Sequence, residues 1–224
     1  EHRTYAAFPD GEFLPQMLGW DDDPCLLLLD NLSDARRPPP WTRDDVERVR
    51  RSLDALHAAP VPAGTPEIGD YGDEFEGWSH IAKDPQPFLG LGLCTERWLE
   101  DTIELLVEAE GAMDKSGDSL LHLDVRSDNL AIRDRALLFD WNWACRGNPE
   151  LDTAFWLPHL GLEGGPMPWE VLPGRAEAAA VVSGFFCHKA GLPIPPDGPP
   201  PEVREFQRRQ GTVALKWAAR ELHL

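Results

Sequence analysis

The segment between Leu120 and Asp152 constrains the fold of this chain more than any other segment. It holds three short apolar runs, and the charged turn Arg133-Asp134-Arg135 separates the second run from the third. Apolar runs of this length, bounded by turn residues, are typical of buried strands. We therefore predict a β-hairpin next to a further strand, and the three strands are Leu120–Leu123, Leu130–Ile132 and Ala136–Phe139.

Polar residues follow these apolar runs in a fixed order. His122, Asp124 and Asn129 form the pattern H-x-D-x-x-x-x-N, and Asp140 ends the third run. Phosphoryl transfer needs a carboxylate that takes the proton of the attacking hydroxyl, and oxygen ligands that fix Mg²⁺ on the nucleotide phosphates. Mg²⁺ accepts few protein ligands because it keeps waters and binds substrate phosphates. Each residue alone is commonly a turn former or a core histidine, but the ordered set indicates this chemistry.

The same residues resemble the signature of the aminoglycoside phosphotransferase and choline kinase family, within the protein-kinase-like superfamily. That signature continues with Asp-Trp and then G-x-P-x-x-D, which here are Asp140-Trp141 and Gly147 to Asp152. Protein kinases carry Phe-Gly after the metal-binding Asp, and an Ala-Pro-Glu motif that does not follow here. The resemblance covers residues 1 to 160 and is strongest over residues 120 to 152.

The resemblance implies a role for each candidate residue. Asp124 would be the catalytic base, and His122 would orient its loop. Arg126 would clamp the transferring phosphate, with a surface arginine as the alternative. Asn129 and Asp140 would hold Mg²⁺ and so take part in nucleotide binding.

Upstream segments resemble the same family. Leu26 to Leu29 is predicted to be a buried strand and resembles the last strand of the N-lobe. The hinge that would bind the base of ATP or GTP is Asp30, Asn31 and Leu32. Leu53 to Ala58 resembles the family's L-x-x-L-H-A helix, and Asp152 would brace the catalytic loop through its backbone.

The expected fold class is α+β, protein-kinase-like, with a remnant of the N-lobe at residues 1–33 and a helical C-lobe at residues 34–224. Helices are predicted from Thr42, a good N-cap, to near Ala59, and from Thr95 to about Met113, where apolar residues recur on one helical face. Further helices are predicted at Ala176–Lys189 and Pro201–Leu224. The rest is assigned to a short helix and turns at 1–24, a loop with one short helix at 60–84, and Pro/Gly-rich loops at 161–174 and 191–200.

One departure from the family pattern is large. The superfamily supplies a Gly-rich loop over the phosphates and a strand Lys that pairs with a helix Glu, and nothing before Leu26 matches the loop or the Lys. Glu1 resembles the pairing Glu without its Lys. We expect the chain to lack most of the N-lobe, to be inactive as given, and to expose one face of Leu26 to Leu29. Reading the coding region upstream of Glu1 would test this.

Composition excludes several other classes of function. The 39 acidic and 21 basic residues give a net charge of −18, which disfavours nucleic acids and anionic membranes as partners. No apolar run approaches the roughly 18 residues of a membrane span. The four cysteines are scattered without metal-ligand spacing, and no signal peptide opens the chain, so we expect a cytoplasmic protein without a zinc site.

The resulting hypothesis is an ATP- (or GTP-) and Mg²⁺-dependent kinase for a hydroxyl of a small molecule. An amine-bearing acceptor such as an aminoglycoside suits the acidic balance, and Trp141, Trp143, Trp156 or Trp169 could contribute cation–π contacts, although most of them are expected in the core. The alternative is a non-catalytic or truncated kinase-like binding domain. A metal-dependent hydrolase is a third hypothesis, but it does not explain the order of the motifs.

Overall fold

The computed structural model describes residues 1–23, 25–194 and 200–224, and the chain forms two compact units. The first unit consists of Glu1–Asp70, Lys115–Trp156 and Glu163–Gly165, and the second consists of Tyr71–Asp114, Leu157–Leu162 and Pro166–Leu224. Pro24 of the turn predicted before the first strand, and residues 195–199 of the predicted second Pro-rich loop, lie outside the described residues. In the described ranges, no helix has both the length and the apolar character to cross a bilayer.

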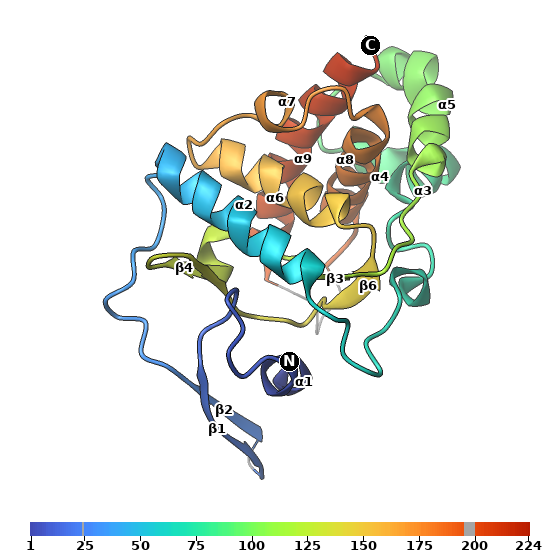
Figure 1. The fold of residues 1–224 in the computed structure, drawn as a ribbon. Helices are drawn as coiled ribbons and strands as arrows, with labels where there is room; N and C mark the ends of the chain where they lie inside the picture. The colour runs from blue at the N-terminus through green and yellow to red at the C-terminus, as the bar shows by residue number, and fades with distance from the viewer. Residues whose placement is uncertain (24, 195–199) are drawn as a thin grey trace. The chain divides into compact units, whose positions relative to one another are not determined.

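The first unit begins with α1 (His2–Ala7) and a hairpin of β1 (Met17–Asp22) and β2 (Cys25–Leu29), drawn in blue in Figure 1. The turn-rich stretch predicted here is in part a strand, because β1 pairs with β2 in antiparallel register. β2 is a strand as predicted, but it is not buried. Leu26 and Leu28 are 57% and 55% exposed, because this sheet has only two strands in the described chain. The expectation that one face of this segment is exposed is therefore confirmed.

The helix predicted after Thr42 is α2 (Arg43–Ala58), and its start is fixed by a capping box. The Thr42 hydroxyl accepts a hydrogen bond from the Asp45 amide at 3.2 Å, and the Asp45 carboxylate accepts one from the Thr42 amide at 2.8 Å. Such boxes satisfy amides that a helix start leaves without partners. The helix packs Val49, Leu53 and Leu56 into the core of the first unit, each at most 2% exposed.

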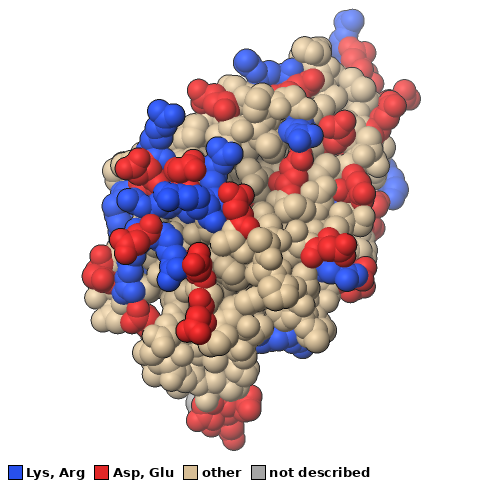
Figure 2. Space-filling view, in the orientation of Figure 1, with Lys and Arg blue, Asp and Glu red and all other residues tan. Residues whose placement is uncertain are grey.

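Positive charge is concentrated around α2. Six of the 21 basic residues are arginines between residues 36 and 51. Figure 2 shows Lys and Arg side chains gathered over this part of the molecule, interspersed with acidic ones. The net charge of −18 therefore does not describe this face of the first unit.

Four short strands form the centre of the first unit. β4 (Leu130–Ile132) and β5 (Ala136–Leu138) are the predicted antiparallel hairpin. The predicted further strand is β3 (Ser119–Leu121), and it pairs with β6 (Cys145–Gly147), a strand that was not predicted. Glycines allow this pairing, because a Cβ on Gly117 would lie 2.5 Å from the Gly147 carbonyl oxygen. The 3₁₀ turn η2 (Ser127–Asn129) precedes β4.

Helices make up the second unit. α5 (Glu96–Ala112), α8 (Ala176–Gly191) and α9 (Pro201–Glu221) agree with the predicted helices, and α8 packs against α3 (Gly77–Lys83), α5 and α9. A short α4 (Gln86–Leu89) follows α3. The predicted loop at 60–84 contains the 3₁₀ turn η1 (Ile68–Tyr71) as well as one helix.

Two helices were not expected. α6 (Glu150–Leu162) continues through Pro158 into the predicted loop at 161–174, and α7 (Pro168–Val171) lies inside that loop. Pro and Gly favour breaks in an isolated helix. The segment 150–162 nevertheless contains a run of fully buried residues, namely Leu151, Ala154, Trp156, Leu157 and Leu160. Burial of this run outweighs the local preference.

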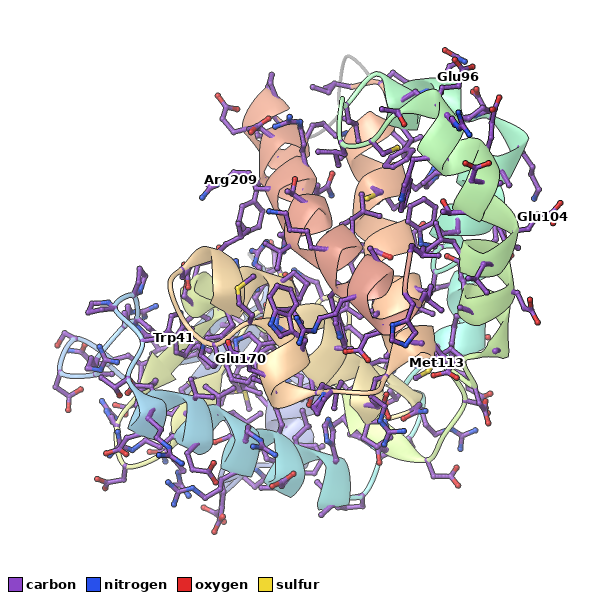
Figure 3. All side chains as sticks on the ribbon, turned by 90° about the horizontal axis from the view of Figure 1, so that it is seen from above. Trp41, Glu96, Glu104, Met113, Glu170 and Arg209 are labelled. Atoms are coloured by element: carbon purple, nitrogen blue, oxygen red, sulfur yellow. The ribbon has the colours of Figure 1, made fainter. Side chains whose placement is uncertain are left out.

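Glu110 on α5 is buried, whereas Glu96 and Glu104 on the same helix point outward (Figure 3). The Glu110 carboxylate accepts hydrogen bonds from two amides at the start of α3, that of Trp78 at 2.8 Å and that of Ser79 at 3.1 Å. Gly184 on α8 faces the same point. A Cβ there would lie 2.4 Å from Oε1 of Glu110 and 2.8 Å from the Trp78 amide nitrogen, so only glycine fits.

Gly184→Ala is therefore expected to lower the free energy of unfolding by about 2–3 kcal/mol, because the added methyl group overpacks a closed contact. Gly111→Ala is the matched control, since a Cβ on that helical glycine has no neighbour within 4 Å. Its free energy of unfolding should rise by up to about 1 kcal/mol. Urea denaturation of both variants measures the difference, and equal effects would contradict the proposed packing.

Candidate active site

The candidate catalytic loop is held by a buried carboxylate. Asp152, in the first turn of α6, has no exposed surface and accepts the amide of His122 at 3.0 Å and the amide of Leu123 at 2.6 Å. Leu123 has a φ of 58°, a left-handed conformation that disfavours side chains with a Cβ. His57, from α2, donates through Nε2 to Asp152 at 2.9 Å. Asp152 thus stabilises a strained point of the loop.

His122 is fully buried, and its two ring nitrogens make different hydrogen bonds. Nε2 lies 3.1 Å from the Phe139 carbonyl, which can only accept, and Nδ1 lies 3.2 Å from the Asp124 amide, which can only donate. The ring therefore carries its proton on Nε2. Burial is the main cause that lowers the pKa of His122, in agreement with this neutral form. His122 links the amide of Asp124 to the end of β5.

Asp124 and Asn129 lie in direct contact. The Asn129 side-chain nitrogen donates to Oδ2 of Asp124 at 2.8 Å and to the Asp124 carbonyl at 3.0 Å. Because the amide nitrogen faces Asp124, the amide oxygen of Asn129 points elsewhere. Burial raises the pKa of the Asp124 carboxyl, against the opposite effect of Arg126. The pair thus presents a partly desolvated carboxylate and one oriented amide oxygen.

Arg126 lies beside the carboxylate that the sequence assigned as the base. Its Nε lies 3.4 Å from Asp124, and its terminal nitrogen lies 3.0 Å from the exposed carboxylate of Asp128. The guanidinium therefore bridges two carboxylates of the same loop.

Asp140 follows β5 with a φ of 67°, so the chain turns sharply at this carboxylate. The Phe139 amide donates to the Asn129 carbonyl at 3.0 Å, which fixes Asp140 relative to the catalytic loop. The Glu1 side chain accepts the Asp140 amide at 3.2 Å. The side-chain amide of Asn142 donates to the Asp140 carboxylate.

The segment predicted as the hinge directly follows β2. Its first amide, that of Asp30, donates to the Gln16 carbonyl at 2.8 Å, and the Leu32 carbonyl accepts the Ala35 amide at 3.1 Å. Among the described residues, no hydrogen bond is formed by the Asp30 carbonyl or by the Leu32 amide. One acceptor and one donor of the backbone are thus available to a ligand.

Two further residues of this site were not identified from the sequence. His57 lies inside the L-x-x-L-H-A pattern, which gave it no role, and it binds Asp152. Glu163 accepts a hydrogen bond from the Ser127 hydroxyl at 2.7 Å and another from the Trp41 indole at 2.8 Å. Nothing in the local sequence distinguishes Glu163 from other surface glutamates.

No group of three or more His, Cys, Asp or Glu side chains suited to a metal ion occurs in the part of the chain that the structure describes. The oxygen ligands proposed from the sequence are one amide and one carboxylate, those of Asn129 and Asp140. Oxygen ligands of this kind fit a hard cation that keeps most of its waters.

Comparisons with known proteins show a similarity of fold. No protein-family model matches the chain, and no curated protein matches it in sequence. A choline/ethanolamine kinase family protein from Mesorhizobium loti is 14% identical with a TM-score of 0.57, and the match covers 96% of this chain and 83% of that one. The chain has the choline-kinase-like fold. An ethanolamine kinase from Plasmodium vivax is 11% identical with a TM-score of 0.51, over 97% of this chain and 70% of that one.

An ADP-bound aminoglycoside phosphotransferase is 17% identical with a TM-score of 0.45, over 92% of this chain and 68% of that one. The first two structures confirm the predicted α+β, kinase-like fold class, and at the level of the fold they confirm the predicted resemblance to choline kinases. At these identities the choline-kinase-like fold is what the proteins share, and function has to be argued from the site.

Asp152→Ala is expected to lower the free energy of unfolding by about 3–5 kcal/mol, because it leaves two buried amides and His57 without their acceptor. Asp118→Ala is the matched control, since that side chain lies just before β3 and is 99% exposed. Its effect should stay within about 0.5 kcal/mol. Chemical denaturation measures both values, and a small loss for Asp152→Ala would show that the loop does not depend on this carboxylate.

Proposed function

We propose that the protein is an ATP- (or GTP-) and Mg²⁺-dependent phosphotransferase that acts on a hydroxyl of a small molecule. The observation that carries the proposal is the contact of Asp124 with Asn129, in a loop that the buried Asp152 holds in a strained conformation. Strain maintained by a buried network is common at functional sites. The coarser statement, a kinase-like fold of the small-molecule branch, rests on the comparisons.

In this proposal Asp124 orients the acceptor hydroxyl and takes its proton as the hydroxyl oxygen attacks the terminal phosphate, and the bond from that phosphorus to the bridging oxygen breaks to release the nucleoside diphosphate. Partial burial supports this role, because a raised pKa makes the carboxylate a better proton acceptor. His122 fixes the Asp124 backbone through the amide. Arg126 turns part of its guanidinium from Asp128 towards the transferring phosphate, where its N–H groups can stabilise the developing charge.

Asn129 and Asp140 are the proposed protein ligands of Mg²⁺, which neutralises charge on the phosphates when it is bound. The orientation of the Asn129 amide supports this assignment, since its nitrogen is held by Asp124 and only its oxygen can bind a cation. Backbone groups of residues 30–32 are proposed to bind the nucleotide base. The division into an N-lobe remnant at 1–33 and a C-lobe at 34–224 belongs to the same proposal.

The acceptor is proposed to be an amine-bearing alcohol. The two structures of similar fold are named for choline and ethanolamine, and the net charge of −18 favours a cationic ligand over an anionic one. The structure leaves fewer tryptophans available for a cation–π contact with the acceptor than the four proposed from the sequence. Trp141 and Trp156 are buried in the core, Trp169 stacks with Arg220, and Trp143 is half-buried and is kept as the proposed candidate.

The alternative is a non-catalytic or truncated kinase-like binding domain. The 224 residues contain four lysines, of which Lys83 is the first, and residues 1–16 contain one glycine. For these 224 residues we expect poor ATP binding and no measurable transfer. Release of ADP from Mg-ATP, with a panel of hydroxylated amines and ³¹P NMR detection of the product, tests the proposed function.

Asp124→Asn should lower kcat by about 10²–10⁴-fold while nucleotide affinity stays nearly constant, because the carboxylate acts on the acceptor and not on the nucleotide. Asp134→Asn, on the exposed β4–β5 turn, is the matched control and should leave kcat unchanged. Both are compared in a form of the protein for which transfer is detected. Turnover of Asp124→Asn close to that of the unmodified protein would exclude Asp124 as the base.

Asp140→Ala should change metal-dependent nucleotide binding as well as rate, because the carboxylate is proposed to hold Mg²⁺ on the phosphates. Calorimetric titration of ATP at several Mg²⁺ concentrations measures this, with Asp134→Ala as the control. The variant is expected to lose most of the dependence of ATP affinity on Mg²⁺. If that dependence is unchanged, Asp140 only forms the turn after β5.

A further inference from the structure

Arg133, at the start of the β4–β5 turn, binds the segment that follows β2 at three points. One terminal nitrogen lies 2.7 Å from the Asp30 carboxylate, and the other lies 2.6 Å from the Asp34 carboxylate. The second nitrogen also donates to the Asn31 carbonyl, and Nε lies 3.1 Å from Asp34. A single guanidinium thus contacts Asp30, Asn31 and Asp34.

These contacts join two parts of the proposed nucleotide site that are far apart in sequence. The β4–β5 hairpin has Asn129 immediately before its first strand and Asp140 two residues after its second. Each strand is three residues long, which is roughly 10 Å. One end of this short hairpin therefore carries the proposed metal ligands, and its turn holds the proposed base-binding segment.

We propose that Arg133 is a positioning residue that fixes the base-binding backbone of residues 30–32 at a set distance from Asn129 and Asp140. This inference rests on the proposed function, because it assumes that a nucleotide bridges the two regions. The Asp30 carbonyl and the Leu32 amide, which make no hydrogen bond among the described residues, flank the Asn31 carbonyl that Arg133 holds. The contact acts on the bound nucleotide only through the backbone.

The ion pairs of Arg133 with Asp30 and Asp34 are partly exposed to solvent, which allows Arg133 to be replaced in a test of its role. The side chains of Arg133, Asp30 and Asp34 are 32%, 37% and 70% exposed, so the ion pairs are screened and contribute little to overall stability. Loss of Arg133 should therefore release the segment without unfolding the protein.

Lysine cannot replace Arg133, because one ammonium group does not reproduce a planar guanidinium that binds separated acceptors. The hydrogen bond from Arg133 is also the main cause that lowers the pKa of Asp30, so both partners are charged near neutral pH.

Adenosine is the probe, because it has no phosphate and depends on the base-binding segment alone. Its dissociation constant is measured from ¹⁵N amide shifts of Asp30, Asn31 and Leu32 in the 224-residue chain. Arg133→Gln and Arg133→Lys should each weaken adenosine binding by about 3- to 10-fold. Arg135, at the other end of the same turn, forms no hydrogen bond or ion pair with residues 30–34 in the described part of the chain, so Arg135→Gln should change the dissociation constant by less than about 2-fold.

The salt dependence of the adenosine dissociation constant is a second measurement, and a purely structural role of Arg133 would not affect it. Adenosine is uncharged, so added salt can weaken its binding only through charged contacts in the protein. The dissociation constant of the unmodified chain should rise between about 0.05 and 0.5 M salt, and that of Arg133→Gln should stay constant. Thermal unfolding of both variants should match that of the unmodified chain.

The outcomes separate this inference from the proposed function. If the unmodified chain binds neither adenosine nor ATP at residues 30–32, the proposed nucleotide site is wrong and the inference fails with it. If it binds adenosine and Arg133→Gln binds equally well, only the role of Arg133 is overturned. An equal loss in Arg135→Gln would also overturn it, because the effect would then be one of overall charge.

Discussion

The hydrogen bonds of the Asp152 carboxylate are the interaction on which the rest of the candidate site depends. A buried ionised carboxylate is costly unless its lone pairs are filled, and here two backbone amides and His57 fill them. The same bonds maintain the left-handed conformation of Leu123. That conformation lets the His122 ring reach the Phe139 carbonyl while its other nitrogen holds the Asp124 amide. The positions of His122 and of the Asp124 backbone thus depend on one buried carboxylate.

The sequence predicted the parts of the site that are local. His122, Asp124, Asn129 and Asp140 fall within one segment whose strands and turn are short, so their order along the chain restricts their positions in space. The start of α2 was predictable for the same reason, because the partners of its capping box are three residues apart. The roles of these residues stay predictions.

Pairings over long separations were not predictable. β6 has only three residues, too few for a recognisable pattern, and its backbone partners are β3 and the distant Pro66 carbonyl. β1 ends in acidic residues that favour a turn, but it pairs with the apolar β2. His57 and Arg133 bind partners 95 and 103 residues away, so nothing near them in sequence indicates the contact. Burial also depends on neighbours, which is why β2 was expected to be buried and has two exposed leucines.

The catalytic hairpin explains how so small a sheet can organise a nucleotide site. β4 and β5 are fully buried, so the core fixes their position, while their ends remain available for polar contacts. At one end the Phe139 amide binds the Asn129 carbonyl, which joins the two proposed metal ligands through the backbone. At the other end the Arg133 side chain binds residues 30–34. A rigid connection of this kind lets a buried apolar core set the distance between two exposed polar sites, because displacement of either end would require movement of the packed strands between them.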